Sequence, residues 1–262
     1  MHLVAFVDLD DTLFQTAPKC PPGALVTVQA VAGQGNPLGF ATGQQSALFA
    51  WLAHGATVIP VTGRTDGALD RVLLPFRSYK VTHHGAVVRT AAGDVVPEWT
   101  AQVQPRLVAA QAALAEGAAR LAVVGAELGV RSRLHTSEGL ATYVSIKANQ
   151  TGVPLPLAPL RAAVAPLVQG TAAIDAVCEL VTQSNQAALA VKGVDKRAAV
   201  ELLKKKLRQS GPCTFLGVGD ARSDAAFLAT CDFAMWPTGS EIANLFHEFV
   251  THGGAGPVES PC

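Results

Sequence analysis

Two aspartates and a threonine directly follow the first apolar segment of this chain. The segment Leu3–Val7 has the length and composition of a buried strand, and Asp8, Asp10 and Thr12 come next at two-residue spacing. Because residues two apart on a strand share a face, a strand that opens near Asp8 can direct both carboxylates into one cleft. Ligands bind at this edge of open α/β sheets, where one acid can act as nucleophile and the other as proton donor. Asp10, Asp11 and Thr12 are also common turn residues, so a polar turn without function is the alternative.

A second apolar run also ends in polar residues suited to phosphate. Residues 58–61 predict a short strand, and Thr62, Gly63 and Arg64 follow it. A hydroxyl and free backbone amides at a strand end can donate hydrogen bonds to phosphate oxygens without adding bulk. This segment is therefore a candidate phosphate loop.

A third apolar run, residues 214–218, leads into another pair of acids. Asp220 comes at the strand end, and Asp224 lies four residues later at the start of a predicted helix. Before this run, Lys196 opens a predicted helix that continues to Leu207. Each signal alone is weak, but their order along one chain is specific.

This order resembles the haloacid dehalogenase superfamily of phosphohydrolases. The resemblance covers both ends of the chain well and its middle poorly. One departure is Ser223, where many relatives carry Asn, although serine still offers a hydroxyl. The four motifs of that superfamily are matched, in chain order, by Asp8, Asp10 and Thr12; by Thr62; by Lys196; and by Gly219, Asp220 and Asp224.

The resemblance implies an α/β fold, a Rossmann-like core with a central parallel sheet plus an inserted α+β cap domain. The block 85–187 interrupts the sheet between the second and third motifs, where the sugar-phosphatase branch inserts its large cap. That branch includes sucrose-phosphate, trehalose-phosphate, mannosyl-phosphoglycerate and Cof-type phosphatases. The core domain would then be discontinuous and consist of residues 1–84 and 188–262.

The resemblance also implies a role for each motif residue. Asp8 would attack phosphorus, while Asp10 would protonate the leaving oxygen and later activate water, which requires surroundings that first favour its protonated form. Mg²⁺ would be held by Asp8, the Asp10 backbone carbonyl and Asp220, with Asp224 orienting the set through water. The phosphoryl oxygens would be held by Lys196, Thr62 and the backbone amides near Leu9 and Gly63.

Substrate recognition is expected from the cap and from Arg64 beside the phosphate loop. For each cap residue the alternative is a solvated strand face, and Arg64 could instead pair with a core aspartate. Shared metal binding by His83 and His84 is disfavoured because neighbours on a strand point to opposite faces. The candidates are Arg64, Arg131, Arg133, His135, Tyr143 and Lys147.

Composition excludes several classes of partner. Hydrophobic residues make up 49% and charged residues 15% of the 262 residues, which predicts a substantial core rather than disorder. Lys plus Arg equal Asp plus Glu at 20 each, so neither nucleic acid nor an anionic membrane is expected as a partner. No apolar stretch approaches membrane-spanning length. The five cysteines are scattered without a CxxC pair, which favours reduced thiols and a cytoplasmic location.

The remaining secondary structure is predicted from periodicity and turn residues. The expected elements are a hairpin (24–32 and 39–42), helices (45–54 and 66–74), a strand (79–82), a hairpin (86–89 and 94–96), a long helix (102–128), strands (132–137 and 142–147), a helix (159–168) and strands (173–181 and 187–191).

The leading functional hypothesis is a magnesium-dependent phosphomonoesterase that acts on a small phosphorylated metabolite, with a sugar phosphate as first candidate. A phosphosugar mutase of the same superfamily is an alternative that the motifs do not exclude. A catalytically idle regulatory protein is a third, but such proteins typically lose a motif aspartate, and all four are present here. Neither the substrate nor the oligomeric state follows from the sequence.

Overall fold

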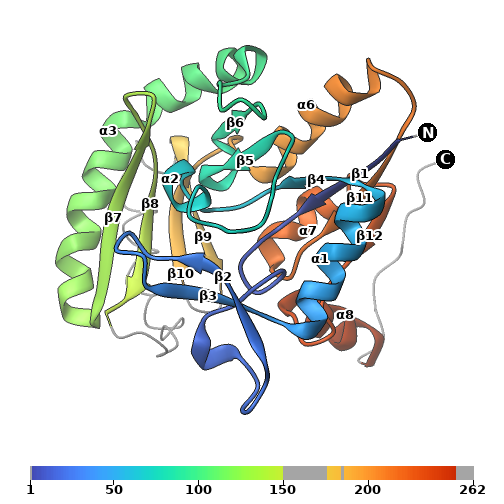
Figure 1. The fold of residues 1–262 in the computed structure, drawn as a ribbon. Coiled ribbons are helices and arrows are strands. Elements are labelled where there is room, and N and C mark those ends of the chain that lie inside the picture. Colours follow the sequence, from blue (N-terminus) through green and yellow to red (C-terminus); the bar gives the residue numbers. More distant parts are fainter. Residues whose placement is uncertain (1, 150–175, 184–185, 252–262) are drawn as a thin grey trace.

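A parallel sheet forms the centre of the molecule. The structure, a computed structural model, describes residues 2–149, 176–183 and 186–251. The strands of this sheet run in the order β12-β11-β1-β4, with each neighbouring pair parallel (Figure 1). They are β1 (His2–Val7), β4 (Thr57–Pro60), β11 (Cys213–Val218) and β12 (Phe233–Met235).

Both faces of the central strand are covered, which explains its uninterrupted apolar sequence. Val4 and Phe6 point into one hydrophobic cluster, while Ala5 and Val7 point into another. Each of these four side chains is 0% exposed. The first cluster includes residues of α6 (Lys196–Arg208) and α7 (Arg222–Leu228), and the second includes Leu52 of α1 (Gly43–Gly55).

A separate antiparallel sheet forms the cap. Its strands run in the order β7-β8-β10-β9, and the helix α3 (Pro97–Leu128) lies along one face (Figure 1). A parallel core with helices and a separate antiparallel cap sheet confirms the predicted fold class. The cap strands are β7 (Val130–Ser137), β8 (Leu140–Ala148), β9 (Cys178–Gln183) and β10 (Gln186–Val191).

The exact domain boundaries stay a prediction, but two pairings bear on them. β6 (Val87–Arg89) pairs back with β5 (Lys80–Thr82), across the predicted boundary at residue 85. The predicted boundary at residue 188 falls inside β10, and β10 pairs along its length with strands of the cap sheet. The cap sheet therefore extends beyond that boundary to Val191.

The hairpin predicted after the first motif is present as β2 (Val26–Val31) and β3 (Pro37–Thr42). Thr42 then starts α1 through a capping box with Gln45, which satisfies backbone donors at the helix start. Outside the sheets, the described chain also contains two short 3-10 helices and two further α-helices, one of which, α2, is described below. The others are η1 (Ala17–Lys19), η2 (His83–Gly85) and α8 (Glu241–Thr251).

The helix predicted at 66–74 is wrong in length. Only α2 (Asp66–Leu69) is helical. The backbone N–H of Leu73 instead donates to the Gln29 carbonyl, and Val72 bridges to Ala30, so the chain joins the hairpin strand β2. Tertiary hydrogen bonds outweigh the local helical pattern here.

The other differences are at element ends. The long helix begins at Pro97, not at residue 102, since proline is well tolerated where a helix N–H has no partner. The second arm of the hairpin predicted at 86–96 makes a single bridge, from Val95 to Arg89. The predicted helix 159–168 and part of the strand 173–181 lie outside the described residues. Among the described residues, no helix has the length and apolarity that crossing a membrane requires.

Candidate active site

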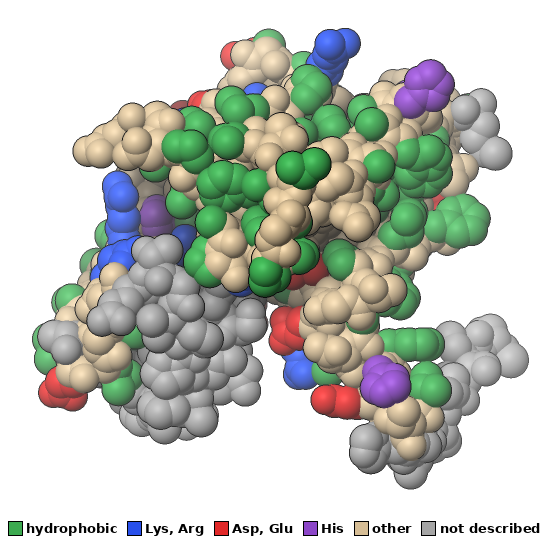
Figure 2. Space-filling view, turned by 60° about the horizontal axis from the view of Figure 1, so that its bottom comes forward, with side chains coloured by type: hydrophobic (Ala, Val, Ile, Leu, Met, Phe, Trp, Pro, Cys, Tyr) green, Lys and Arg blue, Asp and Glu red, His purple; other side chains and the backbone are tan. Residues whose placement is uncertain are grey.

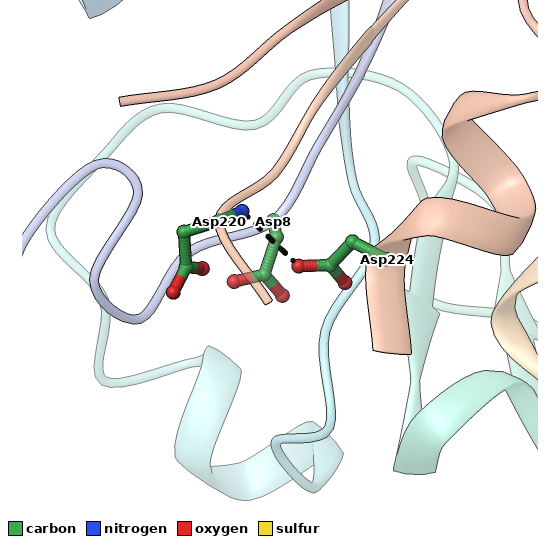
Figure 3. A group of neighbouring side chains, drawn as sticks. All are labelled: Asp8, Asp220 and Asp224. Atoms are coloured by element: carbon green, nitrogen blue, oxygen red, sulfur yellow. Dashed lines mark hydrogen bonds between the residues drawn. The ribbon is translucent and has the colours of Figure 1, made fainter. Parts of the chain in front are cut away.

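Three carboxylates meet at the carboxyl edge of the central sheet. Asp8 follows β1, Asp220 follows β11, and Asp224 lies in the first turn of α7. The first two meet because β1 and β11 are parallel neighbours in register, Val7 opposite Val218. Each residue offers one oxygen, and these three oxygens lie within 4.8 Å of one another. Figure 3 shows the three carboxyl groups side by side.

Lys196 links two of these acids. Its Nζ donates to Asp8 Oδ1 at 2.6 Å and to Asp224 Oδ1 at 2.7 Å. Asp195 places the lysine by capping α6, accepting from the Ala198 backbone N–H. All three charged side chains are buried. Burial would lower the pKa of Lys196, but the carboxylates of Asp224 and Asp8 outweigh it and raise the pKa.

Asp224 is fixed on both sides. Its Oδ2 accepts from the backbone N–H groups of Asp220 (3.2 Å) and Ala221 (3.1 Å), while its Oδ1 accepts from Lys196. A Cβ on Gly219 would stand 2.7 Å from the Asp224 Cβ, so this turn requires glycine. Asp224 is thus held rigidly, as an orienting residue must be.

The cluster is short of positive charge. Burial raises the pKa of Asp8 well above its ordinary value, more than Lys196 lowers it. Burial and then the Asp224 charge raise the pKa of Asp220 to about 7. One lysine does not balance three carboxylates, so the set of oxygen donors fits a hard divalent cation.

Asp10 does not join this cluster, and its surroundings contradict one prediction. Arg64 holds it with two parallel hydrogen bonds, Nε to Oδ2 and Nη2 to Oδ1, both 2.7 Å. Desolvation would raise the pKa of Asp10, but Arg64 outweighs it and the pKa lies below its ordinary value. Asp10 is therefore ionised in this state, whereas surroundings favouring the protonated form were predicted. The pairing of Arg64 with a core aspartate had been considered as an alternative.

The predicted phosphate loop begins at a buried residue and continues through the half-buried Gly63 and Arg64. The Thr62 side chain is 1% exposed, and its Oγ1 accepts from the Arg64 backbone N–H at 3.2 Å. A Cβ on Gly63 would stand 2.4 Å from the His84 ring, so only glycine lets the imidazole approach. Leu9 is also fully buried, and its carbonyl accepts from the backbone N–H of Leu13 at 2.8 Å.

Thr12 and His84 contribute to the site in ways the sequence reasoning missed. The Thr12 hydroxyl donates to Asp220 Oδ1 at 2.9 Å and so ties the first motif to the fourth. Burial and then the Lys196 charge lower the pKa of His84 to about 3, which keeps its imidazole neutral. Glycine at position 63 leaves room for the His84 imidazole, and this small residue was the feature of the sequence that could have indicated the contact.

His83 and His84 make different polar contacts, although both rings lie against the Tyr143 ring, and neither residue is on a strand as predicted. Both have left-handed backbone angles, with φ of 52° and 57°, so they lie in a turn and not on a strand. His83 Nδ1 is 2.9 Å from Thr142 Oγ1 in the cap, whereas His84 packs against Gly63.

The predicted cap residues share one face of the cap sheet. Cross-strand partners point the same way, and β7 and β8 are paired through this region. Tyr143 reaches the core, because its hydroxyl donates to the Gly63 carbonyl at 3.1 Å. Its ring stacks on His135, with 4.4 Å between the centroids. The pairs on this face are Arg131 with Lys147, Arg133 with Ser145 and His135 with Tyr143.

The three cap cations differ in what they contact. Arg131 Nη1 donates to the Ala148 carbonyl at 2.7 Å, so this guanidinium binds its own sheet. Lys147 is exposed, and its charge contributes to the lowered pKa of Asp10. Among the described residues, Arg133 has no acidic ion-pair partner. In Figure 2, Lys and Arg side chains lie beside a His on the left, the side where Figure 1 places the cap, while other Lys, Arg and His side chains are scattered over the rest of this face.

Comparisons with solved structures agree with this geometry at the level of the fold. No protein-family model matches the sequence, and no curated protein sequence matches it. The sucrose-phosphatase of Synechocystis sp. PCC6803, solved with sucrose and phosphate, is similar over 97% of this chain and 90% of its own, with 13% identity and a TM-score of 0.57. A trehalose-6-phosphate phosphatase related protein is similar over 89% of this chain and 85% of its own, with 19% identity and a TM-score of 0.52.

An enzyme with a different substrate has the same architecture. The IMP-nucleotidase of Plasmodium falciparum is similar over 96% of this chain and 68% of its own, with 14% identity and a TM-score of 0.55. These solved structures therefore match most of the chain in fold, a parallel core sheet with helices and a separate antiparallel cap sheet. At these identities the match extends to the fold and not to the substrate.

Proposed function

We propose that the protein is a magnesium-dependent phosphomonoesterase that works through an aspartyl-phosphate on Asp8. The observation that carries this proposal is the convergence of Asp8, Asp220 and Asp224, of which the buried Asp8 and Asp224 are both held by Lys196. A structural ion pair would need one acid for Lys196, whereas this site buries an excess of negative charge. Such an arrangement costs stability unless a cation offsets it.

Magnesium would be held by Asp8, Asp220 and the backbone carbonyl of Asp10, with Asp224 behind them. It fits because every donor is an oxygen and the cluster carries an unbalanced negative charge. When bound, the ion supplies positive charge that lets an anionic phosphate approach the carboxylates.

The first chemical step would use the free oxygen of Asp8. Lys196 donates to Oδ1, so Oδ2 is the oxygen available for attack on phosphorus. The new bond joins this oxygen to phosphorus, the bond from phosphorus to the leaving oxygen breaks, and Asp10 gives that oxygen its proton. Lys196, Thr62 and the amides of Leu9 and Gly63 would donate hydrogen bonds to the phosphoryl oxygens.

In the second step, water would hydrolyse the aspartyl-phosphate. Asp10, now ionised, accepts a proton from the water as its oxygen bonds to phosphorus, and the Asp8 carboxylate leaves. Inorganic phosphate is released, Asp8 is again a free carboxylate, and Asp10 gives up its proton to solvent when it pairs with Arg64 again. A transfer back to sugar would instead make the protein a mutase.

Arg64 has to release Asp10 before the first step. Its two hydrogen bonds hold Asp10 ionised, and an acid without a proton cannot protonate a leaving group. A phosphate group entering beside Arg64 presents oxygens in the same bidentate geometry and competes for the guanidinium. In this scheme substrate binding frees Asp10 to take up a proton.

The substrate is proposed to be a small phosphorylated metabolite, with a sugar phosphate first. The support is the cap and the similarity to a sucrose-phosphatase and to a trehalose-6-phosphate phosphatase related protein. A cytoplasmic site of action is proposed because four described cysteines are free, Cys20, Cys178, Cys213 and Cys231. The residues proposed to contact the leaving group are Arg64, Arg131, Arg133, His135, Tyr143 and Lys147.

The decisive experiment compares Asp8→Asn with Asp11→Asn. Asp11 lies in the same loop but pairs with Lys19 on the surface, so it is a matched control. With para-nitrophenyl phosphate and Mg²⁺, kcat should fall at least about 1,000-fold for Asp8→Asn and by no more than a few-fold for Asp11→Asn. Circular dichroism would verify that both fold.

Two further readouts complete this test. Metal chelation should abolish activity of the wild-type protein, and added Mg²⁺ should restore it. Released inorganic phosphate, measured against isomerised sugar phosphate, separates a phosphatase from a mutase. Appreciable magnesium-dependent turnover by Asp8→Asn would show that Asp8 is not the nucleophile.

A further inference from the structure

A cavity of about 370 Å³ lies between the core and the cap, apart from the carboxylate cluster. Residues 65–67 and Arg71 form its core wall, and residues 133–136 of β7 form its cap wall. None of the four proposed catalytic or metal-binding aspartates lines it, and neither does Lys196. The site adjoins the phosphate loop, because Thr65 follows Arg64 in the chain.

Two arginines face this cavity from opposite walls. Arg71 belongs to the core and Arg133 to the cap, and neither forms an ion pair with a described acidic residue. Arg71 Nη1 donates to the Gly67 carbonyl, but its Nε is buried without a hydrogen-bond partner in the described part of the chain. Because this Nε is buried, it contributes charge to the cavity wall rather than a donor that a ligand in the cavity can reach.

The one acid that lines the cavity is already neutralised. Asp66 Oδ2 accepts from Arg89 Nε at 2.8 Å, and its Oδ1 accepts from the Thr82 hydroxyl at 2.5 Å. The charge available to a ligand is therefore that of Arg71 and Arg133. A concave site with two unpaired guanidinium groups fits a group with two or more anionic oxygens.

Neutral hydrogen-bond donors on the cavity wall also favour an anionic ligand. Thr65 Oγ1 accepts from the Ala68 backbone N–H, which leaves its own hydroxyl proton free to donate. The side chain of Thr136 is exposed on the opposite wall. His135 lies between this cavity and Tyr143, the residue that contacts the phosphate loop.

We propose that this cavity is a second anion site, which binds a phosphate or carboxylate group between Arg71 and Arg133. The anion has two possible sources, a second acidic group on the substrate or a separate small anion. Because its walls come from both core and cap, a bound anion would stabilise the arrangement in which Tyr143 contacts Gly63.

The binding test is calorimetric titration of metal-stripped protein with inorganic phosphate. Without metal, the acidic cluster repels phosphate, so the second site dominates the signal. Arg71→Gln and Arg133→Gln should each weaken binding about 10- to 100-fold, as expected for the loss of a charge-assisted hydrogen bond. Arg77→Gln is the control, because Arg77 is an exposed core arginine that does not line the cavity.

The result that overturns the proposal is wild-type affinity for phosphate in both arginine variants, or no phosphate binding by the wild-type protein. Arg71→Lys, which keeps the charge, should bind more tightly than Arg71→Gln and excludes simple misfolding as the cause. These measurements need no turnover, so they stand even if the protein is not a phosphatase.

A comparison of KM values for two substrates identifies the source of the anion. If it belongs to the substrate, Arg71→Gln should raise KM about 10-fold or more for glucose 1,6-bisphosphate and leave KM for para-nitrophenyl phosphate unchanged. If it is a separate anion, the variant should lose phosphate binding while both KM values change together. Either pattern, together with the calorimetric loss, supports the site.

Discussion

Replacement of Asp220 by asparagine should stabilise the metal-free protein, although it removes a proposed metal ligand. Burial and the Asp224 charge raise the pKa of Asp220 from 3.8 to about 7. That is about three units, and one unit corresponds to about 1.4 kcal/mol. Ionising Asp220 in the folded, metal-free protein therefore costs up to about 4 kcal/mol at pH 8.

The direction of the pH dependence follows from the same shift. Between pH 4 and pH 7, the folded chain keeps a proton on Asp220 that the unfolded chain has lost. The free energy of unfolding of the metal-free protein should therefore fall as the pH rises through this range. Burial of Asp8, whose pKa is also raised, acts in the same direction.

Asparagine removes the charge but keeps an oxygen that can accept the Thr12 hydroxyl. In urea denaturation without metal, Asp220→Asn should exceed the wild-type free energy of unfolding by up to about 4 kcal/mol at pH 8. The difference should shrink toward zero near pH 4. Added Mg²⁺ should stabilise the wild-type protein at pH 8 and have much less effect on the variant.

The exposed residue Asp94 provides the control, and Asp94→Asn should leave stability within about 0.5 kcal/mol at either pH. A less stable Asp220→Asn at pH 8 would refute the reasoning. So would an equal gain at pH 4 and pH 8, because repulsion between ionised carboxylates cannot persist once they are protonated.

Three other changes probe the contacts around the site. Arg64→Gln removes the charge that lowers the pKa of Asp10 in the free enzyme. The limb of the kcat/KM–pH profile that reports this acid should therefore move to higher pH, and a limb that stays in place would mean that it does not report Asp10. Tyr143→Phe loses the hydrogen bond to the phosphate loop but keeps the ring. The variant's kcat/KM should fall about 2- to 10-fold while its stability stays nearly unchanged. A large drop in melting temperature would mean that the contact is structural. Gly85→Ala would place a Cβ 2.2 Å from backbone at the start of α6, while Gly93→Ala, also at positive φ, meets no atom within 4 Å. In urea unfolding, Gly85→Ala should therefore be less stable than Gly93→Ala by roughly 2–3 kcal/mol. Equal losses of stability would mean that the backbone near Gly85 shifts easily.

Much of the core could be predicted from short segments of the sequence. Short apolar runs that end in polar residues predicted β1, β4 and β11, and parallel neighbouring strands necessarily bring their carboxyl ends to one edge. That geometry is why Asp8 and Asp220 meet across 211 intervening positions of the printed chain. The amphipathic pattern after Lys196 likewise predicted α6.

Element ends were less predictable, because they depend on partners elsewhere. The residues after Leu69 continue a helical pattern, yet Val72 and Leu73 pair with β2. Trp51 is 60% exposed, whereas Trp99 is buried and donates to the Gly85 carbonyl at 3.0 Å. The hydrophobic periodicity of a segment does not show which of its side chains a distant part of the chain will cover.

By itself, the sequence determined the order of elements, the positions of the acids at strand ends and the lysine that opens α6, since each depends on residues a few positions apart. Only the tertiary structure decided that Arg64 holds Asp10 ionised, that Tyr143 reaches Gly63, and that Arg71 and Arg133 face one cavity. The physical reason is that charge pairing and burial depend on distances between segments far apart in the chain. Those distances are set by strand register and by the position of the cap on the core.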